Sequence, residues 1–137
     1  METFILEKDI KVLYVEATSF PDGIMEAHEK LHDLVPFDIN RRYFGISRPE
    51  NGTIVYKAAA EVTFSGEAEE LNCDTMTVKK GRYISSTVRN FKQEPHKIEK
   101  AFQKLLMHDN LDLKGYCVEW YMNDEDIVKC MIKLKDI

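Results

Sequence analysis

The sequence has no paired cysteines and no long apolar run. Its three cysteines, Cys73, Cys117 and Cys130, lie far apart and form no CxxC motif, which argues against a disulfide framework and a structural zinc site. No segment approaches the roughly 18 consecutive apolar residues of a membrane span. The first residues, Met1 to Phe4, carry an acidic side chain where a signal peptide is basic. We therefore expect free thiols and a cytoplasmic protein that does not enter a membrane.

Positive charge is also scarce. The chain has 19 lysines and arginines against 24 aspartates and glutamates, for a net charge of −5. A protein that binds nucleic acid needs a basic face to displace counterions from phosphates, and the only basic pairs are Arg41-Arg42 and Lys79-Lys80. We expect no direct contact with nucleic acid, whereas an acidic surface suits a basic protein partner. The chain also lacks a P-loop, a nucleophile elbow and a Rossmann fingerprint, so we predict no cofactor.

The first half of the chain shows a β-α-β-β pattern. β-Branched and aromatic residues predict a strand over Ile10–Thr18, which residues 4–6 extend. A Pro21-Asp22-Gly23 turn follows, and apolar residues at helical spacing then predict a helix over Ile24–Val35. An Asn-Gly dipeptide is a strong hairpin signal. It places the remaining elements of this half: a strand over 42–48, a turn over 49–52 and a strand over 53–64.

The same order of elements returns after a polar, acidic stretch, residues 65–73, which we interpret as a linker. Glu94-Pro95 opens a second helix with proline in its first turn. The predicted strands of this half are 75–89, with a break at Lys79-Lys80-Gly81, then 114–122 and 127–134, separated by a turn at 123–126. The chain thus divides into repeat one, about 1–64, and repeat two, about 74–137.

The two repeats also align position by position. When repeat two is laid on repeat one, Phe91 falls on Phe20 and the apolar positions of the two helices coincide. The connection after the helix is slightly longer in repeat two, and beyond it Glu119 falls on Ser47. We therefore predict one domain over 1–137 with an α+β fold, in which two β-α-β-β repeats related by a pseudo-twofold axis form one curved antiparallel sheet with two helices on one face. The helix-free face would then curve around a central groove.

The stretch Tyr116–Met122 is the candidate site. It holds the only tryptophan, Trp120, and a carboxylate in the middle of a strand. Alternation places Glu119 and Tyr121 on one face and Trp120 on the other, fully apolar face. We assign the apolar face to the core and Glu119 to the helix-free groove. There a carboxylate among rings can pair with a ligand cation or act as a general base, the alternative being a solvated surface glutamate.

The segment His28-Glu29-Lys30-Leu31-His32 matches HExxH, in which two histidines one turn apart bind zinc and the glutamate activates water. No third ligand is evident, because His96 and His108 lie in the other half. The second helix has Glu99 and Gln103 at the matching positions. We therefore interpret both histidines as part of a polar helix surface and predict no metal site.

Three segments together resemble a known family. They are residues 78–83 (VKKGRY), the second helix over 97–106, and residues 117–121 (CVEWY) with the closing strand 130–134. Their order is similar to the GyrI-like small-molecule-binding family, the effector-binding fold of AraC-type and MerR-type multidrug regulators, which also occurs as stand-alone proteins. The resemblance implies a pocket where the repeats meet, with Glu119 at its centre. The other residues that it implies in or near this pocket are Tyr83, Tyr121, Trp120, Tyr43 and Ser47.

The resemblance implies three functions. The first, which we expect, is binding of a hydrophobic or cationic aromatic small molecule, linked to transcription regulation or xenobiotic sensing. The second is a hydrolase that opens strained cyclopropane rings of toxic compounds, with Glu119 and Tyr121 as its catalytic residues. The third is a gyrase-inhibitor-like module that binds a protein partner. We place catalysis second because the sequence has no independent nucleophile constellation.

Overall fold

The computed structural model describes residues 1–122 and 126–136. The elements of the first half are β1 (Glu2–Leu6), β2 (Ile10–Glu16), α1 (Ile24–Leu34), β3 (Tyr43–Glu50) and β4 (Thr53–Glu61). Those of the second half are β5 (Asp74–Val78), β6 (Gly81–Arg89), α3 (His96–Leu105), β7 (Cys117–Tyr121) and β8 (Ile127–Lys133). The short helix α2 (Glu67–Glu70) lies between them. None of the described helices is long and apolar enough to cross a bilayer.

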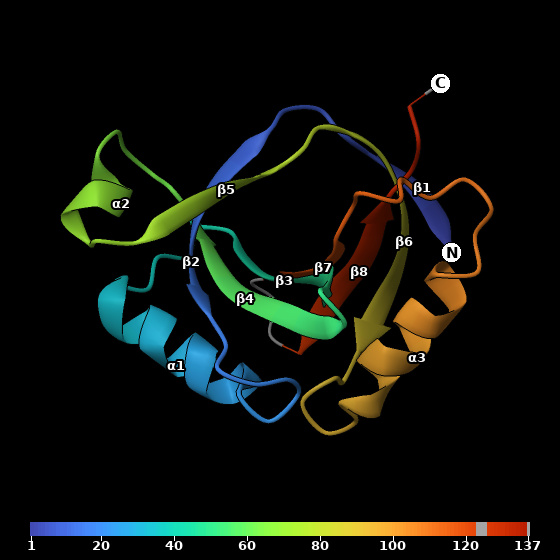
Figure 1. Cartoon of the computed structure of the whole chain (residues 1–137), viewed down its shortest axis with the longest axis horizontal. Coiled ribbons are helices and arrows are strands. Elements are labelled where there is room, and N and C mark those ends of the chain that lie inside the picture. The colour runs from blue at the N-terminus through green and yellow to red at the C-terminus, as the bar shows by residue number, and fades with distance from the viewer. Residues whose placement is uncertain (123–125, 137) are drawn as a thin grey trace.

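The eight strands within the described residues form one antiparallel sheet in the order β1-β6-β8-β7-β3-β4-β2-β5. Each strand of one half has its counterpart at the mirrored place in this order, and the halves meet at the β7–β3 pair. The alignment of the repeats that equates Ser47 with Glu119 also equates Ile46 with Val118, and these last two residues lie directly opposite each other across that pair. The pseudo-twofold axis therefore passes between them, which confirms the predicted symmetric α+β fold (Figure 1).

The first strand of each half is exchanged with the other half. We expected one strand over 10–18 with 4–6 as its extension, but β1 and β2 are separate strands. β1 pairs with β6, and in the same way β5 pairs with β2. Each half thereby covers what would be an open edge of the other half's strands. Each repeat is consequently β-β-α-β-β, with one strand more than the sequence pattern indicated.

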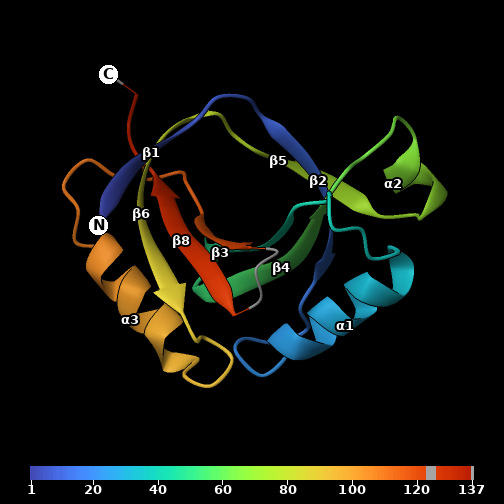
Figure 2. The ribbon, with the colours of Figure 1, turned by 180° about the vertical axis from the view of Figure 1, so that it is seen from behind.

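The sheet curls so that its helix-free face encloses a core of its own (Figures 1 and 2). This core contains Leu6, Ile10, Val12, Phe44, Ile46, Ala59, Val78, Tyr83, Val118 and Met131. Helices α1 and α3 cover the opposite face, where α1 packs on β2 and β4 and α3 packs on β6 and β8. Both faces are therefore packed with apolar side chains. The expectation of a groove on the helix-free face is wrong, because that face is filled by the core.

The linker predicted over residues 65–73 contains α2 and a buried ion pair. Arg41 and Glu67 are only 5% and 4% exposed. The two terminal guanidinium nitrogens of Arg41 contact the two carboxylate oxygens of Glu67 at 3.0 and 2.9 Å. The backbone N–H and the hydroxyl of Thr63 donate to the same carboxylate. Arg41 also donates to the backbone carbonyl of Glu61, the last residue of β4, at 3.0 Å, so these contacts fix the connection between the halves to the end of β4.

The predicted helices and the first hairpin are present with small changes at their ends. Helix α1 begins at the predicted residue. Pro49 and Glu50 belong to β3 rather than to the turn. The turn itself consists of Asn51 and Gly52, whose φ angles of 53° and 83° suit the two-residue connection of a hairpin. Of the turn predicted over 123–126, all but the last residue lie outside the described residues.

Candidate functional site

Strand β7 presents Glu119 toward the helices. The predicted partition of its side chains is correct, because Val118 and Trp120 pack in or against the core of the helix-free face. Tyr121 packs against the apolar side chains under α1 and also against those under α3. Glu119 shares the face of Tyr121. It therefore lies on the helix-bearing face, and our assignment of this residue to the helix-free side is wrong.

Gly45 of β3 leaves the space in which the site is built. It lies opposite Glu119 in the β3–β7 register. A Cβ atom at this position would lie 2.0 Å from the Tyr56 hydroxyl oxygen and 2.8 Å from Glu119 Oε1. Gly45 is not among the glycines with positive φ, so its backbone does not require glycine. The missing side chain lets the phenol of Tyr56, on β4, pass over β3 and reach Glu119.

Four polar side chains then form a hydrogen-bonded group, which we call the Glu119 cluster: Glu119, Tyr121, Tyr56 and His28. The Tyr121 hydroxyl donates to Glu119 Oε1. The Tyr56 hydroxyl lies 3.1 Å from the same oxygen and 3.2 Å from the Tyr121 hydroxyl. His28 Nε2, on α1, lies 2.8 Å from the Tyr56 hydroxyl. Because Tyr56 has one proton to give, its donation to Glu119 requires the His28 Nε2–H to donate to Tyr56.

The carboxylate of Glu119 has no counter-ion among the residues that the structure describes. Burial raises the pKa of Glu119, and the hydrogen bonds from Tyr121 and Tyr56 oppose that shift. Burial, assisted by the charge of His32, lowers the pKa of His28 to about 4. His28 is therefore neutral near pH 7 and does not balance the charge of Glu119. Glu119 still keeps partial contact with solvent.

Both tyrosines of the cluster remain hydrogen-bond donors. Burial raises the pKa of Tyr56 and of Tyr121, and the neighbouring charge of Glu119 raises both further. A protonated phenol is the form that can donate to a carboxylate. The cluster therefore holds a single group that can carry negative charge, Glu119, with two neutral donors and one neutral imidazole around it.

Aromatic rings from two symmetry-related loops lie over the cluster. The ring of Phe20, in the β2–α1 loop, is 6.1 Å from that of Tyr56, and the ring of Phe91, in the β6–α3 loop, is 5.7 Å from that of Tyr121. These phenylalanines are the pair that the alignment of the two repeats equates. Both views of the ribbon show the two loops beside each other between α1 and α3 (Figures 1 and 2). His28 meets both tyrosine rings edge-on, at 5.7 and 5.4 Å.

Two further predicted residues share the face of the cluster without joining its hydrogen bonds. Ser47 lies opposite Tyr56 in the β3–β4 register. Tyr43 lies opposite Tyr121 in the β3–β7 register, but its ring stacks on Phe37 at 5.9 Å. The Tyr43 hydroxyl accepts a hydrogen bond from a backbone N–H of the loop after α1. Ser47 is therefore next to the cluster, and Tyr43 supports the neighbouring loop.

Tyr83 and Trp120 lie on the opposite, helix-free face. Tyr83 is buried in its core, and its hydroxyl donates to a backbone carbonyl. The ring of Trp120 contacts those of Phe44 and Phe4 at 5.6 and 5.9 Å. The sheet separates both residues from Glu119. Neither can therefore contact a ligand that is bound at the Glu119 cluster.

Five members of the site were not predicted: Tyr56, Gly45, His28 and the loop phenylalanines Phe20 and Phe91. Our interpretation of His28 as an incidental surface residue is wrong, since it bonds to Tyr56. His32, one turn further along α1, lies against the ring of Tyr43 instead, at 5.3 Å. Within the described part of the chain, no three histidine, cysteine or acidic side chains are grouped so that they could hold a metal ion.

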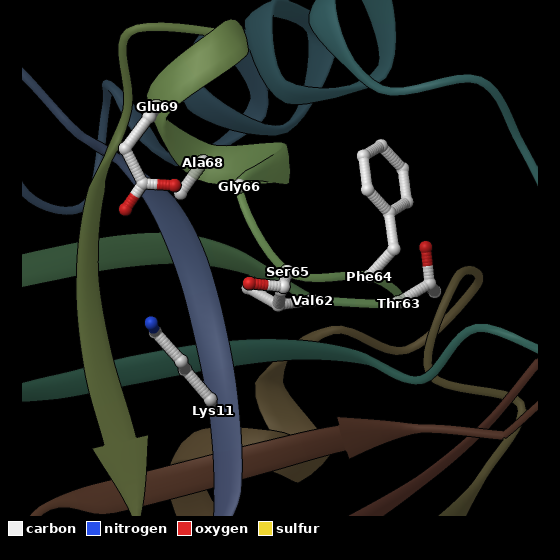
Figure 3. Close-up of a pocket in the computed structure, with 8 residues that line it drawn as sticks. All are labelled: Lys11, Val62, Thr63, Phe64, Ser65, Gly66, Ala68 and Glu69. Carbon is white, nitrogen blue, oxygen red and sulfur yellow. The ribbon is translucent and has the colours of Figure 1, made fainter.

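Two surface hollows lie outside the cluster. One of about 610 Å³ lies beside α2 and is lined by Lys11, Val62, Thr63, Phe64, Ser65, Gly66, Ala68 and Glu69. Figure 3 shows these residues spread over β2, α2 and the segment that joins β4 to α2. A second hollow, of about 360 Å³, lies between the β2–α1 loop and the β3–β4 hairpin and reaches Phe20. Phe20 therefore borders free space.

No protein-family model matches the sequence, and no curated protein matches it. Solved structures share its fold. An integron cassette protein from the mobile metagenome of Vibrio cholerae has a TM-score of 0.74 at 13% identity, covering 98% of this chain and 95% of that chain. The protein SAV2435, solved bound to tetraphenylphosphonium, has a TM-score of 0.71 at 13% identity, covering 98% and 93%.

A third structure with this fold comes from Staphylococcus aureus MU50 and is provisionally assigned to bacterial transcription regulation. Its TM-score is 0.65 at 12% identity, covering 98% of this chain and 97% of that chain. Each likeness extends over nearly the whole of both chains. At these identities it shows the fold alone.

Proposed function

We propose that the protein binds hydrophobic, aromatic organic cations at the Glu119 cluster. The carboxylate of Glu119 supports this most directly, because it has two phenol donors and no cationic partner in the described residues. Removing a carboxylate from water costs several kcal/mol unless a positive charge compensates it. A ligand cation supplies that charge. The proposal thus explains why an unpaired acidic residue stands in the middle of a packed sheet.

The rings around the cluster suit the remainder of such a ligand. Phe20, Phe91, Tyr56 and Tyr121 offer faces on which aryl groups can stack and toward which a cation is attracted. In the structure the rings of Phe20 and Phe91 pack against those of Tyr56 and Tyr121, so an aryl group that stacks on either tyrosine has to displace one of them. Binding therefore requires Phe20 or Phe91 to turn outward. Phe20 is 41% exposed and borders a hollow, so its ring has room to move.

The fold is compatible with this ligand class. One protein of the same fold was solved with tetraphenylphosphonium, an aromatic cation without hydrogen-bond donors. The resemblance to the GyrI-like family likewise implies an acidic residue at the centre of a small-molecule site. We extend the proposal accordingly to a stand-alone effector-binding domain, which senses xenobiotics or regulates transcription through a separate DNA-binding partner.

Replacing Glu119 by glutamine should weaken binding of tetraphenylphosphonium at pH 8 at least tenfold, or by about 1.4 kcal/mol. Glutamine keeps the shape of the side chain and an oxygen that accepts from both tyrosines, but it carries no charge. Isothermal titration calorimetry at low salt measures the change. Triphenylphosphine oxide, which is neutral, should bind equally to both proteins.

The matched control is Glu29→Gln, which removes one exposed carboxylate from α1 beside His28. This variant should bind the cation within about twofold of the original protein, because exposed charges act weakly through water. Binding that is as tight in Glu119→Gln as in Glu29→Gln contradicts the proposal, as does a failure of any tetraaryl cation to bind.

A hydrolase is the second candidate, favoured by the raised pKa of Glu119 and its bond to Tyr121. A carboxyl group whose pKa is raised keeps its proton over a wider pH range and can then donate it to a reacting bond. Cys117 shares this face, but burial raises its pKa to about 11, so it is not a thiolate nucleophile. Turnover of a cyclopropane-bearing compound should disappear in Glu119→Ala, and turnover that survives removes Glu119 from the mechanism. No observation favours the gyrase-inhibitor alternative.

A further inference from the structure

We propose that the Glu119 cluster binds its cation in exchange for a proton, which Glu119 holds in the empty site and releases to water when the cation enters. This inference rests on the proposed function and adds a coupling to it. The exchange is balanced: a neutral carboxylic acid and a ligand cation become a carboxylate–cation pair and one proton in solvent. The site is then neutral both when empty and when full.

The hydrogen bonds of the cluster suit both protonation states of Glu119. Tyr121 and Tyr56 both point to Oε1, while Oε2 accepts no hydrogen bond from the described residues. The carbonyl oxygen of a carboxylic acid accepts two hydrogen bonds, as a carboxylate oxygen does. A proton on Oε2 can therefore come and go without either tyrosine moving. Oε2 is also the oxygen that remains available to a ligand cation, so the proton and the cation compete for this one atom.

The other groups that face Glu119 do not take over its role. They come from every element around it: His28 from α1, Tyr56 from β4, Tyr121 and Cys117 from β7, and Cys130 from β8, which lies opposite Glu119 in the register. The remaining neighbours, Gly45 and Ser47 of β3 and Phe91 of the β6–α3 loop, carry no charge.

Burial keeps these titratable neighbours neutral over a wide pH range. It raises the pKa of Cys117 to about 11 and that of Cys130 to about 12, and it raises the pKa of both tyrosines. It lowers the pKa of His28 to about 4. None of the groups that face Glu119 is expected to change charge between pH 5 and pH 8.

The sign of the pH dependence follows from these shifts. Burial raises the pKa of Glu119 in the empty protein, and a bound cation favours the carboxylate and so lowers that pKa. At a pH below the raised pKa of Glu119 in the empty site, each cation that binds displaces up to one proton. The affinity for the cation then falls by up to tenfold for each unit by which the pH is lowered. Above that pKa the carboxylate is already ionised. Affinity then no longer depends on pH and no proton is released.

Calorimetric titration with tetraphenylphosphonium between pH 5 and pH 8 tests the exchange. Repeating each titration in two buffers of different ionisation enthalpy counts the protons released. We expect a release that approaches one proton at the acidic end and declines as the pH rises, with affinity rising in parallel. Glu119→Gln should bind weakly, with no dependence on pH and no proton release.

Two further variants separate the contributions of the neighbours. Tyr56→Phe removes a hydrogen bond that favours the carboxylate, so the window of proton release should move to higher pH. His28→Gln keeps an N–H donor but removes the imidazole. If Glu119 is the proton source, His28→Gln should still release the proton, whatever its affinity. Loss of the release in His28→Gln would assign the proton to the histidine instead.

The possible failures are distinct from one another. Cation binding with constant affinity from pH 5 to pH 8 and no proton release overturns the exchange but leaves the proposed function standing. Proton release that persists in Glu119→Gln also overturns it, because another group is then the source. If no tetraaryl cation binds at any pH, the proposed function fails and the exchange fails with it.

Discussion

Replacing Gly45 by alanine is expected to destabilise the protein by about 2–3 kcal/mol, although alanine is ordinarily the better residue inside a strand by roughly 0.5–1 kcal/mol. The added methyl group would lie 2.0 Å from the Tyr56 hydroxyl oxygen and 2.8 Å from the ring carbon that bears it. Strand β3 cannot retreat, because it is paired with β4 on one side and β7 on the other. The phenol has to move, and the hydrogen bond from Tyr56 to Glu119 is lost.

Urea unfolding at 25 °C measures this loss, and titration with tetraphenylphosphonium should show weaker binding by tenfold or more. The control is the same substitution in a Tyr56→Leu background, where the hydroxyl and the distal ring atoms are gone. There Gly45→Ala should cost much less, because only the close contact with the flexible end of Glu119 remains, and the two changes should be strongly non-additive. An alanine at position 45 that costs less than about 0.5 kcal/mol in the original protein would mean that the phenol does not cross β3.

The twofold scaffold carries a site that is not twofold. The halves share the loop phenylalanines, Phe20 and Phe91, which lie over the two tyrosines from both sides. The pseudo-twofold axis also relates Ser47 to Glu119, so the strands place a hydroxyl and a carboxylate at equivalent positions. Duplication therefore explains the symmetric frame of rings. In the proposed site, the charge that would select a ligand, that of Glu119, comes from the second half alone.

The sequence predicted correctly those elements whose structure depends on residues that are close together in the chain. The helix that begins at Ile24 and the Asn51-Gly52 turn are specified by local spacing and backbone preference, and both are present. The equivalence of the two halves could also be predicted from the sequence, since their helices and hairpins align position by position. The exchange of β1 and β5 between the halves could not be predicted from the sequence, because the pairing of strands from opposite halves of the chain leaves no local pattern.

The assignment of the two faces of β7 failed for a physical reason. Alternation divides a strand into two sets of side chains, but it does not say which set meets the helices. The more apolar set, with Val118 and Trp120, looked like the side that helices cover. It packs instead into the second core that the curl of the sheet creates.

The missed residues show which sequence signals were usable. Tyr56 and His28 reach Glu119 from elements far away in the chain, so nothing local connects the three. Gly45 is different, since a glycine inside a strand often marks the close approach of another group. The alignment of Phe20 with Phe91 was a second signal, because equivalent rings near the predicted axis suggest a shared site. Together these two observations would have pointed to the helix-bearing face.

The largest loss of stability is expected from Arg41→Met, about 3–5 kcal/mol, because it leaves the buried carboxylate of Glu67 without its cation. The two side chains are 5% and 4% exposed, and their contacts tie the connection between the halves to β4. Burial by itself would raise the pKa of Glu67, but the hydrogen bonds from Arg41 and Thr63 outweigh it, and the pKa is lowered. The pair therefore contributes stability above the ordinary glutamate pKa, and this contribution is lost as the pH falls through the lowered value.

The adjacent residue provides the matched control. Arg42 pairs with Glu61, but the side chains of that pair are 38% and 22% exposed, so Arg42→Met should cost only about 1 kcal/mol in urea unfolding at pH 7. The double variant Arg41→Met with Glu67→Leu should recover most of the lost stability, because it removes the unpaired buried carboxylate and leaves two apolar side chains. Equal losses for Arg41→Met and Arg42→Met would show that burial does not make the Arg41–Glu67 pair more important for stability than the exposed pair. A double variant no more stable than Arg41→Met alone would show that the unpaired carboxylate of Glu67 is not the cause of the lost stability.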